Sequence, residues 1–248
     1  MSGQPFDERA DVYEAMIDWP KRLANEEPFY RWIFERAKAA SVLDVACGTG
    51  HHAAMFHSWG LRVEGADLSE EMIRRCHQRH GESESLRWVV RGFDRPAERE
   101  FDVAICVGNS LAVADRETVP KAIGQMMRAV RKGGAIVTHV VNLWSLPDGP
   151  AVWQKCLRKP MPQGDSIIVK GVQRCGGRGF VNLLVASLGE PGPQELKAEA
   201  VPFLGLESAE LEAIAREAGA TMVEFYGNYR RQGYHREKSQ DLIMVAMK

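Results

Sequence analysis

The chain has 248 residues, of which 45% are hydrophobic and 26% are charged. This balance is typical of a globular protein and excludes disordered and fibrous classes. The length fits one α/β domain with a moderate insertion. The 32 basic and 33 acidic side chains give a net charge of −1, so the basic excess usual in nucleic-acid-binding proteins is missing and we do not expect nucleic acid as a partner.

Five scattered cysteines without a C-x-x-C pair argue against a disulfide framework or a structural zinc site, and they favour a reducing compartment. Residues 1–19 lack the apolar core of a signal peptide. No apolar run reaches the ~20 residues that span a bilayer. We therefore expect a cytoplasmic protein without a membrane partner; the oligomeric state is left open.

Apolar side chains recur every three or four residues over residues 9–38, which predicts amphipathic helix. Pro20 and Pro28 are expected to divide this helix into two or three pieces. We interpret residues 1–40 as an N-terminal helical lid segment.

Strands and helices then alternate, which predicts right-handed βαβ units and a parallel sheet. The helix that starts after Ser69 has this serine as its N-cap, and the pair Gly133–Gly134 is expected to stop the last helix of the series. The predicted strands are 42–46, 62–66, 86–90, 102–107 and 135–141, and the predicted helices are 53–59, 70–79 and 119–130.

The alternation fails in residues 146–205, where prolines are frequent and strand-like pieces occur at 166–173 and 180–187. We interpret this region as an inserted substrate cap whose antiparallel strands lie over the sheet. The alternation resumes with a helix at 208–219 and strands at 221–226 and 242–247, which predict an antiparallel edge hairpin. The expected fold is α/β, with a Rossmann-like, mostly parallel seven-stranded sheet formed by residues 41–145 and 206–248, and with helices on both faces.

The segment D-V-A-C-G-T-G-H-H-A connects the first strand to the first helix of this sheet. Gly48 and Gly50 allow a tight turn that approaches a ligand closely. Asp67 follows Gly48 by nineteen residues at the end of the second strand, where its carboxylate can accept both ribose hydroxyl protons. The spacing of Gly48, Gly50 and Ala53 also matches the nicotinamide-dinucleotide fingerprint, so a dehydrogenase is a rival interpretation.

Three features favour a sulfonium cofactor over a dinucleotide. Asp44 lies in the strand before the loop, where its carboxylate can balance the charges of an α-ammonium and a sulfonium. Phe93 and Asp94 follow the third strand and suit the face and the amino group of an adenine. The fourth strand ends in C-V-G-N-S, which opens toward the reactive end of the cofactor.

The segments VLDVACGTGHHA, VEGADLSEEMI, WVVRGFD, FDVAICVGNSLA and RAVRKGGAIV together resemble the successive motifs of class I S-adenosylmethionine-dependent methyltransferases. The resemblance covers residues 10–145 and 206–248, and Ala46 stands where many members carry a glycine. The glycine/sarcosine N-methyltransferase branch is the most similar. Its members also have D-V-A-C-G-T-G and C-x-G-N-S, an asparagine that matches Asn142, and an arginine 22 residues before the motif aspartate, which matches Arg22 before Asp44.

The resemblance implies S-adenosylmethionine as cofactor, with S-adenosylhomocysteine as product. Arg22 is implied for the cofactor carboxylate, Asp67 for the ribose and Asp94 for the adenine. The implied cofactor-binding residues are Arg22, Asp44, Ala46, Gly48, Gly50, Asp67, Leu68, Phe93, Asp94, Val107 and Gly108, within the loops 46–50 and 107–110.

The expected reaction is in-line methyl transfer to a small-molecule acceptor, an amine nitrogen of glycine or sarcosine type. Asn109 and Asn142 are candidates to hold this amine. His139 is a candidate pocket residue or a packed strand residue, and Tyr13 either closes over the cofactor or belongs to the core. An O-, S- or C-methyltransferase and a nicotinamide-dependent oxidoreductase are the alternative functions.

Two further patterns have simpler interpretations. His51 and His52 are adjacent and face apart on a helix, so no metal site is expected. Residues 229–238 mix basic and aromatic side chains, which is interpreted as an exposed hairpin loop rather than an RNA-binding loop. Arg174 and Arg178 are the nearest candidates for binding a carboxylate of the acceptor.

Overall fold

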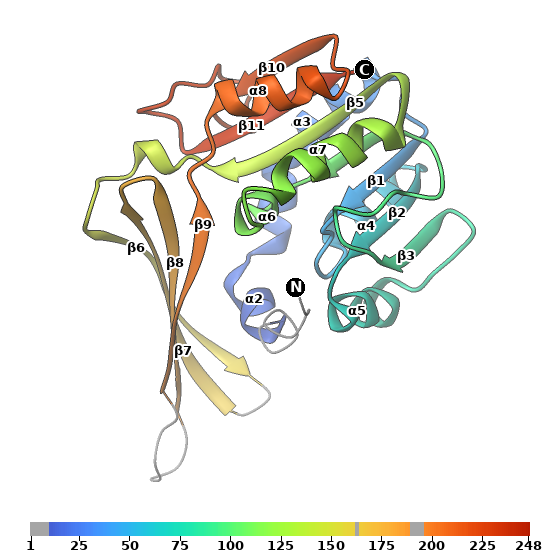
Figure 1. Cartoon of the computed structure of the whole chain (residues 1–248). Coiled ribbons are helices and arrows are strands. Elements are labelled where there is room, and N and C mark those ends of the chain that lie inside the picture. The colour runs from blue at the N-terminus through green and yellow to red at the C-terminus, as the bar shows by residue number, and fades with distance from the viewer. Residues whose placement is uncertain (1–9, 162–163, 189–195) are drawn as a thin grey trace.

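The computed structural model describes residues 10–161, 164–188 and 196–248. A seven-stranded sheet has the strand order β10-β11-β5-β4-β1-β2-β3. Neighbours among β1 to β5 pair in parallel, whereas β11 is antiparallel to both β5 and β10. The predicted Rossmann-like sheet with an antiparallel C-terminal hairpin is confirmed (Figure 1). Its strands are β1 (Ser41–Val45), β2 (Arg62–Asp67), β3 (Leu86–Val90), β4 (Phe101–Cys106), β5 (Val130–Val141), β10 (Met222–Tyr226) and β11 (Asp241–Met247).

Helices cover both faces of this sheet, and each face has its own buried apolar cluster. One cluster contains Phe29, Phe56 and Ile73 from three helices on the same face. The other contains Leu111, Ala122 and Leu211 from the helices on the opposite face. The helices of the first face are α3 (Trp19–Arg36), α4 (His51–Ser58) and α5 (Glu70–His80), and those of the second are α6 (Ser110–Val113), α7 (Thr118–Ala129) and α8 (Ser208–Glu217).

The N-terminal helices differ from the prediction at one proline. Helix α2 (Ala10–Met16) and helix α3 are separate, and Pro20 lies in the first turn of α3. Pro28 lies inside α3 and does not end it, so the prediction of a break there is wrong. A proline inside a helix costs about 3 kcal/mol, and the complete burial of Phe29 and Tyr30 just after it supplies packing that offsets this cost.

The boundary between α7 and β5 is also different from the prediction. The helix ends at Ala129, before the glycine pair, and the strand begins at once because Val130 pairs with Phe101. The register then shifts before Val103 pairs with Ala135, so the intervening residues form an irregular bulge. Helix α5 begins as predicted, since the Ser69 side chain accepts a hydrogen bond from the backbone of Met72.

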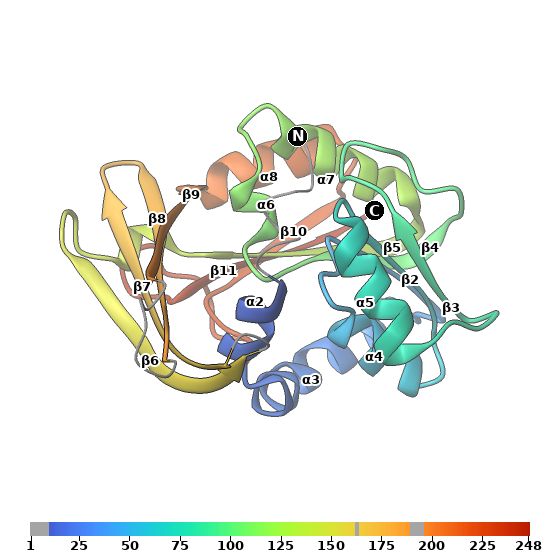
Figure 2. The same cartoon turned by 90° about the horizontal axis from the view of Figure 1, so that it is seen from below.

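A second, antiparallel sheet has the order β6-β7-β8-β9. It lies beyond one end of the core sheet, where β6 contacts α2 and β9 contacts α6 (Figures 1 and 2). We expected these strands to lie over the core sheet, but helices already cover both of its faces. Among the described residues, no helix has the length and apolar character needed to cross a membrane. The strands are β6 (Ala151–Met161), β7 (Gly164–Cys175), β8 (Arg178–Ser187) and β9 (Leu196–Leu204), and a 3-10 turn (Leu143–Ser145) precedes them.

Candidate cofactor and acceptor site

The predicted site residues gather at the carboxyl ends of β1 and β4. These two strands are neighbours in the centre of the sheet. The chain continues from β1 toward β2 and β3 on one side, and from β4 toward β5 on the other. Their ends therefore flank a topological switch point, where open α/β sheets bind ligands. The loops 46–50 and 107–110 both start there.

The loop after β1 has a backbone that favours glycine. Ala46 has φ 61° and Gly48 has φ 57°, and the left-handed region is unfavourable for a residue with a side chain. This conformation explains why a glycine suits the position of Ala46. The ring of Tyr13 approaches to 3.8 Å from where a Cβ of Gly48 would stand. The Gly48 N–H donates a 2.9 Å hydrogen bond to Asp67 Oδ2, which ties this loop to the end of β2.

Asp44 is a buried carboxyl group near the end of β1, with 1% of its surface exposed. Neither of its oxygens has a hydrogen-bond partner among the described residues. Burial, reinforced by the charge of Asp67 and opposed by that of Arg22, raises the pKa of Asp44 to about 8. A cation bound next to Asp44 would stabilise its ionised form, so this carboxyl group fits the α-ammonium of S-adenosylmethionine.

Arg22 extends from α3 toward the loop after β4. Its Nη2 lies 3.6 Å from where a Cβ of Gly108 would stand. Its Nε donates to Glu26 Oε1 at 2.8 Å, and Glu26 also contacts His52 Nε2 at 2.7 Å. Burial opposes the charge of Glu26, but His52 and Arg22 together lower its pKa to about 2. The result is a guanidinium held in one direction, available to a carboxylate near loop 107–110.

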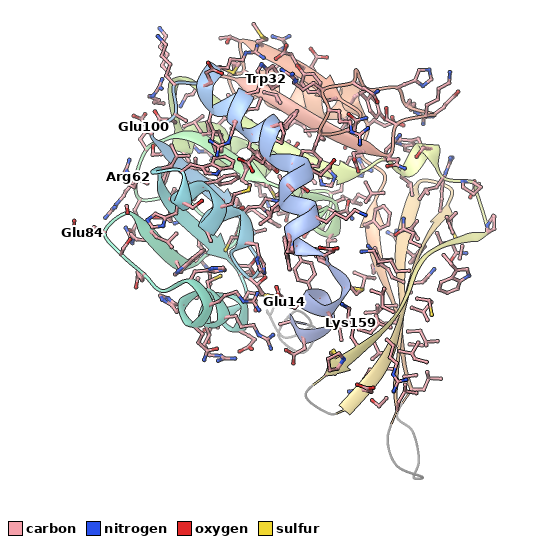
Figure 3. All side chains as sticks on the ribbon, turned by 180° about the vertical axis from the view of Figure 1, so that it is seen from behind. Glu14, Trp32, Arg62, Glu84, Glu100 and Lys159 are labelled. Atoms are coloured by element: carbon pink, nitrogen blue, oxygen red, sulfur yellow. The ribbon has the colours of Figure 1, made fainter. Side chains whose placement is uncertain are left out.

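Helix α2, which carries Glu14 (Figure 3), lies against the glycine loop through Tyr13. The Tyr13 hydroxyl lies 4.0 Å from the Cβ positions of both Gly48 and Gly108, so Tyr13 bridges the two loops. Glu14 accepts hydrogen bonds from Thr49 Oγ1, His51 Nε2 and Arg79 Nη1. Burial opposes the charge of Glu14, but His51, Thr49 and Arg79 lower its pKa to about 2. These contacts fasten α2 to α4 and α5.

The sequence interpretation missed Glu14 and Glu26. Glu26 follows Arg22 by four residues, a helical spacing that places the two side chains together and could have indicated the pair. No local signal could identify Glu14, because Thr49 and Arg79 lie 35 and 65 residues away from it.

Asn109 and His139 join the ends of β4 and β5. Asn109 has φ 72°, and its Oδ1 accepts a 2.9 Å hydrogen bond from the backbone of Val141. His139 Nδ1 accepts from the Gly108 N–H at 3.2 Å, and His139 Nε2 contacts Asp241 Oδ1 at 3.1 Å. With Nδ1 as acceptor, Nε2 carries the proton and donates to Asp241. Both ring nitrogens of His139 are therefore engaged.

Asn142 is almost fully buried, with 1% exposure. Its Nδ2 donates to the carbonyl oxygens of Arg236 and Ser239, each at 2.7 Å. Its Oδ1 accepts from the Tyr234 hydroxyl at 3.1 Å. Asn142 thus holds the loop between β10 and β11 against the end of β5, with all its polar side-chain atoms engaged.

The residues expected around ribose and adenine lie at the ends of β2 and β3. Asp67 also accepts from the backbone of Ser69 at 3.0 Å. Leu68 is 44% exposed. Both Leu68 and Asp94 lie close to Gly92: Leu68 Cδ1 is 3.5 Å and Asp94 Oδ1 is 2.9 Å from where a Cβ of Gly92 would stand. Phe93 is half-buried against the apolar cluster that contains α7. Val107, in the loop after β4, is 6% exposed.

Comparisons with known proteins agree with this geometry. A family model described as a methyltransferase domain matches residues 42–134. This match supports the resemblance of residues 42–134 to class I S-adenosylmethionine-dependent methyltransferases. The match confirms the predicted family resemblance. The prediction of S-adenosylmethionine as the cofactor is confirmed with it.

Three similar proteins illustrate the range of the methyltransferase domain. The glycine/sarcosine N-methyltransferase of Parasynechococcus marenigrum is 30% identical over 56% of this chain and 51% of that protein. The malonyl-[acyl-carrier protein] O-methyltransferase of Pectobacterium atrosepticum is 32% identical over 46% of this chain and 44% of that protein. The structure of CalS10 with bound S-adenosylmethionine, an amino pentose methyltransferase of Micromonospora echinaspora, has TM-score 0.72 and 19% identity, and covers 96% of this chain and 97% of that one. The chain spans about half the length of the curated relatives it matches.

Proposed function

We propose that this protein transfers a methyl group from S-adenosylmethionine to an amine nitrogen of a small molecule of glycine or sarcosine type. The observation that supports the proposal is that Asp44, a buried carboxyl without a hydrogen-bond partner among the described residues, lies within the electrostatic influence of the oriented Arg22 guanidinium. With its ionised form stabilised by a bound ammonium, Asp44 would complement the ammonium of an amino-acid end, and Arg22 would complement its carboxylate. A nicotinamide dinucleotide would instead bring its negative pyrophosphate to this loop, next to Asp44, which weighs against the oxidoreductase alternative.

The remaining cofactor assignments follow the same geometry. In this proposal Asp67 accepts the ribose hydroxyls, Asp94 accepts from the adenine amino group, and Leu68 and Phe93 pack against the adenine. The loops 46–50 and 107–110 enclose the methionine end, with Ala46, Gly48, Gly50, Val107 and Gly108 as contacts. Residues 10–40 act as the lid, since α2 within them is fastened across the glycine loop by Glu14; residues 1–9 of the predicted lid segment lie outside the described residues.

When bound, the cofactor supplies a methyl group already activated by its sulfonium. The chain's own residues then need to align the acceptor and exclude water, which can contribute on the order of 7–11 kcal/mol. In the proposal His139 holds the Gly108 backbone in place, and Asn109 ties the loop after β4 to Val141 on β5. Asn142 supports the end of β5, and Tyr13 closes the site from α2.

The choice of nitrogen over oxygen rests on the engagement of His139. An oxygen acceptor needs a base to remove its proton, but both ring nitrogens of His139 already have partners. A neutral amine brings its own lone pair and needs no such base. O-methyl transfer is kept as the second candidate because of the similarity to an O-methyltransferase.

The test measures tritium transferred from labelled S-adenosylmethionine to a panel of small amines and alcohols, together with binding of S-adenosylhomocysteine by calorimetry. Wild type should bind the cofactor product and label an amine, and Asp67→Asn should weaken that binding about 10-fold through the loss of ribose hydrogen bonds to a charged group. Asp115→Asn, an exposed carboxylate that caps the start of α7, is the control and should leave binding unchanged. Absence of cofactor binding would refute the proposal, and labelling of alcohols alone would replace nitrogen by oxygen.

A further inference from the structure

One face of the second sheet points toward α2 and the core, as the register and burial of β6 and β7 indicate. Lys155 pairs with Lys170 and Leu157 with Ile168, so these four side chains share a face. Ile168 is fully buried. Lys155 Nζ donates a 2.7 Å hydrogen bond to the carbonyl oxygen of Met16, at the end of α2. Figure 2 shows α2 between this sheet and the core.

Lys170 interrupts an apolar stripe on this face. Ile168 and Val172, two residues away on each side along β7, are 0% and 2% exposed, whereas Lys170 is half-buried. No hydrogen bond or ion pair joins the Lys170 ammonium to another residue in the part of the chain that the structure describes. Within the described residues, Lys170 is therefore a half-buried cation that lies between two buried apolar side chains of β7 and has no anionic partner.

The charges that act on Lys170 are of its own sign. Burial lowers the pKa of Lys170, and the positive charges of Lys155 and Arg22 lower it further. Glu199 lies on the same face but two strands away, because Lys170 pairs with Leu183 and Leu183 with Glu199. Lys170 therefore belongs to a positive region that continues toward Arg22 and, through it, toward loop 107–110.

We propose that Lys170 binds an anionic group of the methyl acceptor, with Lys155 adding to the positive potential, so that the acceptor is a small amine carrying a carboxylate or a phosphate. This inference rests on the proposed function and adds the residue that binds the anionic group of its substrate. Arg174 and Arg178, the candidates from sequence, lie at the turn between β7 and β8. Arg174 donates to the carbonyl oxygens of Gly176 and Leu146, so its guanidinium already has partners.

The experiment compares two pairs of amines that differ in one anionic group. Glycine is paired with glycinamide, and 2-aminoethyl phosphate with ethanolamine. Calorimetry on protein loaded with S-adenosylhomocysteine measures acceptor binding without any methyl transfer, and tritium transfer measures KM and kcat. Wild type should prefer the anionic member of at least one pair, and the pair that shows the preference identifies the anion.

Two substitutions and one control make the test specific. Lys170→Met keeps the length of the side chain and removes its charge, so it should weaken binding of the anionic acceptor and raise its KM about 30-fold, while the neutral partner and kcat change less than about 2-fold. Lys170→Arg should restore most of the loss. Lys159→Met removes another lysine from the same face, where Lys159 pairs with Ser166, and should have little effect.

Each contrary result overturns the inference. No preference for either anionic member in wild type would do so, as would equal losses for anionic and neutral amines in Lys170→Met. A weaker affinity for S-adenosylhomocysteine in Lys170→Met would assign Lys170 to the cofactor carboxylate instead. Failure of the proposed function would give a different result, because wild type would then neither transfer a methyl group nor bind S-adenosylhomocysteine.

Discussion

Two buried carboxyl groups in neighbouring regions of the core differ in whether other side chains balance their charge. Glu26, on α3, is 3% exposed and contacts the side chains of Arg22, Tyr30 and His52. Asp44, on β1, is 1% exposed and has no partner among the described residues. The pKa of Glu26 is lowered to about 2 by its partners, and that of Asp44 is raised to about 8 by burial. Among the described residues, the fold thus gives Glu26 charged partners within the core and leaves Asp44, the residue proposed to bind the cofactor ammonium, without one.

The largest expected effect comes from removing the balanced charge. Glu26→Gln leaves the Arg22 guanidinium buried without its counter-ion, and breaking a buried pair costs about 3–5 kcal/mol of unfolding free energy. Because the pKa of Glu26 is lowered, its stabilisation is complete above the ordinary value of 4.5 and is lost as the pH falls toward 2. Urea denaturation at pH 7 and at pH 3 measures both effects.

A matched control lies on the same helix. Glu27 pairs with Arg31 at the same four-residue spacing, but both side chains are exposed, at 39% and 54%. Glu27→Gln should therefore cost at most about 0.5 kcal/mol. Equal losses for Glu26→Gln and Glu27→Gln would break the comparison, because burial would then make no difference to the pair.

The next effect concerns Asp44, whose substitution should weaken cofactor binding but raise the stability of the cofactor-free protein. Asp44→Asn should weaken S-adenosylhomocysteine binding about 100-fold, since a neutral amide cannot pair with the ammonium. The cofactor-free variant should nevertheless be more stable than wild type at pH 8, by about 4 °C in Tm. The reason is that a raised pKa makes the stability from Asp44 decline as the pH rises from 3.8 through 8.

The pH profile of binding gives a second readout for Asp44. Ionised Asp44 is the form that binds the ammonium, so calorimetric affinity of wild type should fall as the pH decreases below 8, and this limb should vanish in Asp44→Asn. A wild-type affinity that does not change between pH 6 and pH 8 would contradict the assignment of Asp44.

The smallest effect is expected at α2. Glu14→Gln weakens the contacts that fasten α2 to the glycine loop, and the release rate of S-adenosylhomocysteine should rise about 5-fold, as loss of a partly exposed ion pair of about 1 kcal/mol implies. Asp11→Asn, whose partner Arg75 lies on α5, is the control on the same helix, since Asp11 is 45% exposed and does not contact the loop. Stopped-flow fluorescence measures both rates, and a release rate in Glu14→Gln equal to that of wild type would show that Glu14 does not fasten a lid.

The elements that sequence predicted best are those with strong local signals. The strands β1 to β5 and the helix α5 with its Ser69 cap were predicted within a few residues, apart from the early start of β5. The strands β6 and β9 were not predicted, because edge strands with exposed polar residues lack the alternation that indicates a strand. The pairing of β6 with β7 and of β9 with β8 imposes their conformation.

The amino-acid sequence by itself indicated the methyltransferase resemblance, the strands of the parallel sheet and the position of the glycine loop, because each is carried by short motifs that are local in the chain. Only the tertiary structure decided how the charges are balanced. Among the described residues Asp44 has no hydrogen-bond partner, Glu14 fastens α2, and Lys170 lies near Arg22. Each of these facts depends on elements that are distant in sequence and that meet only when the sheet, the helices and the second sheet pack together.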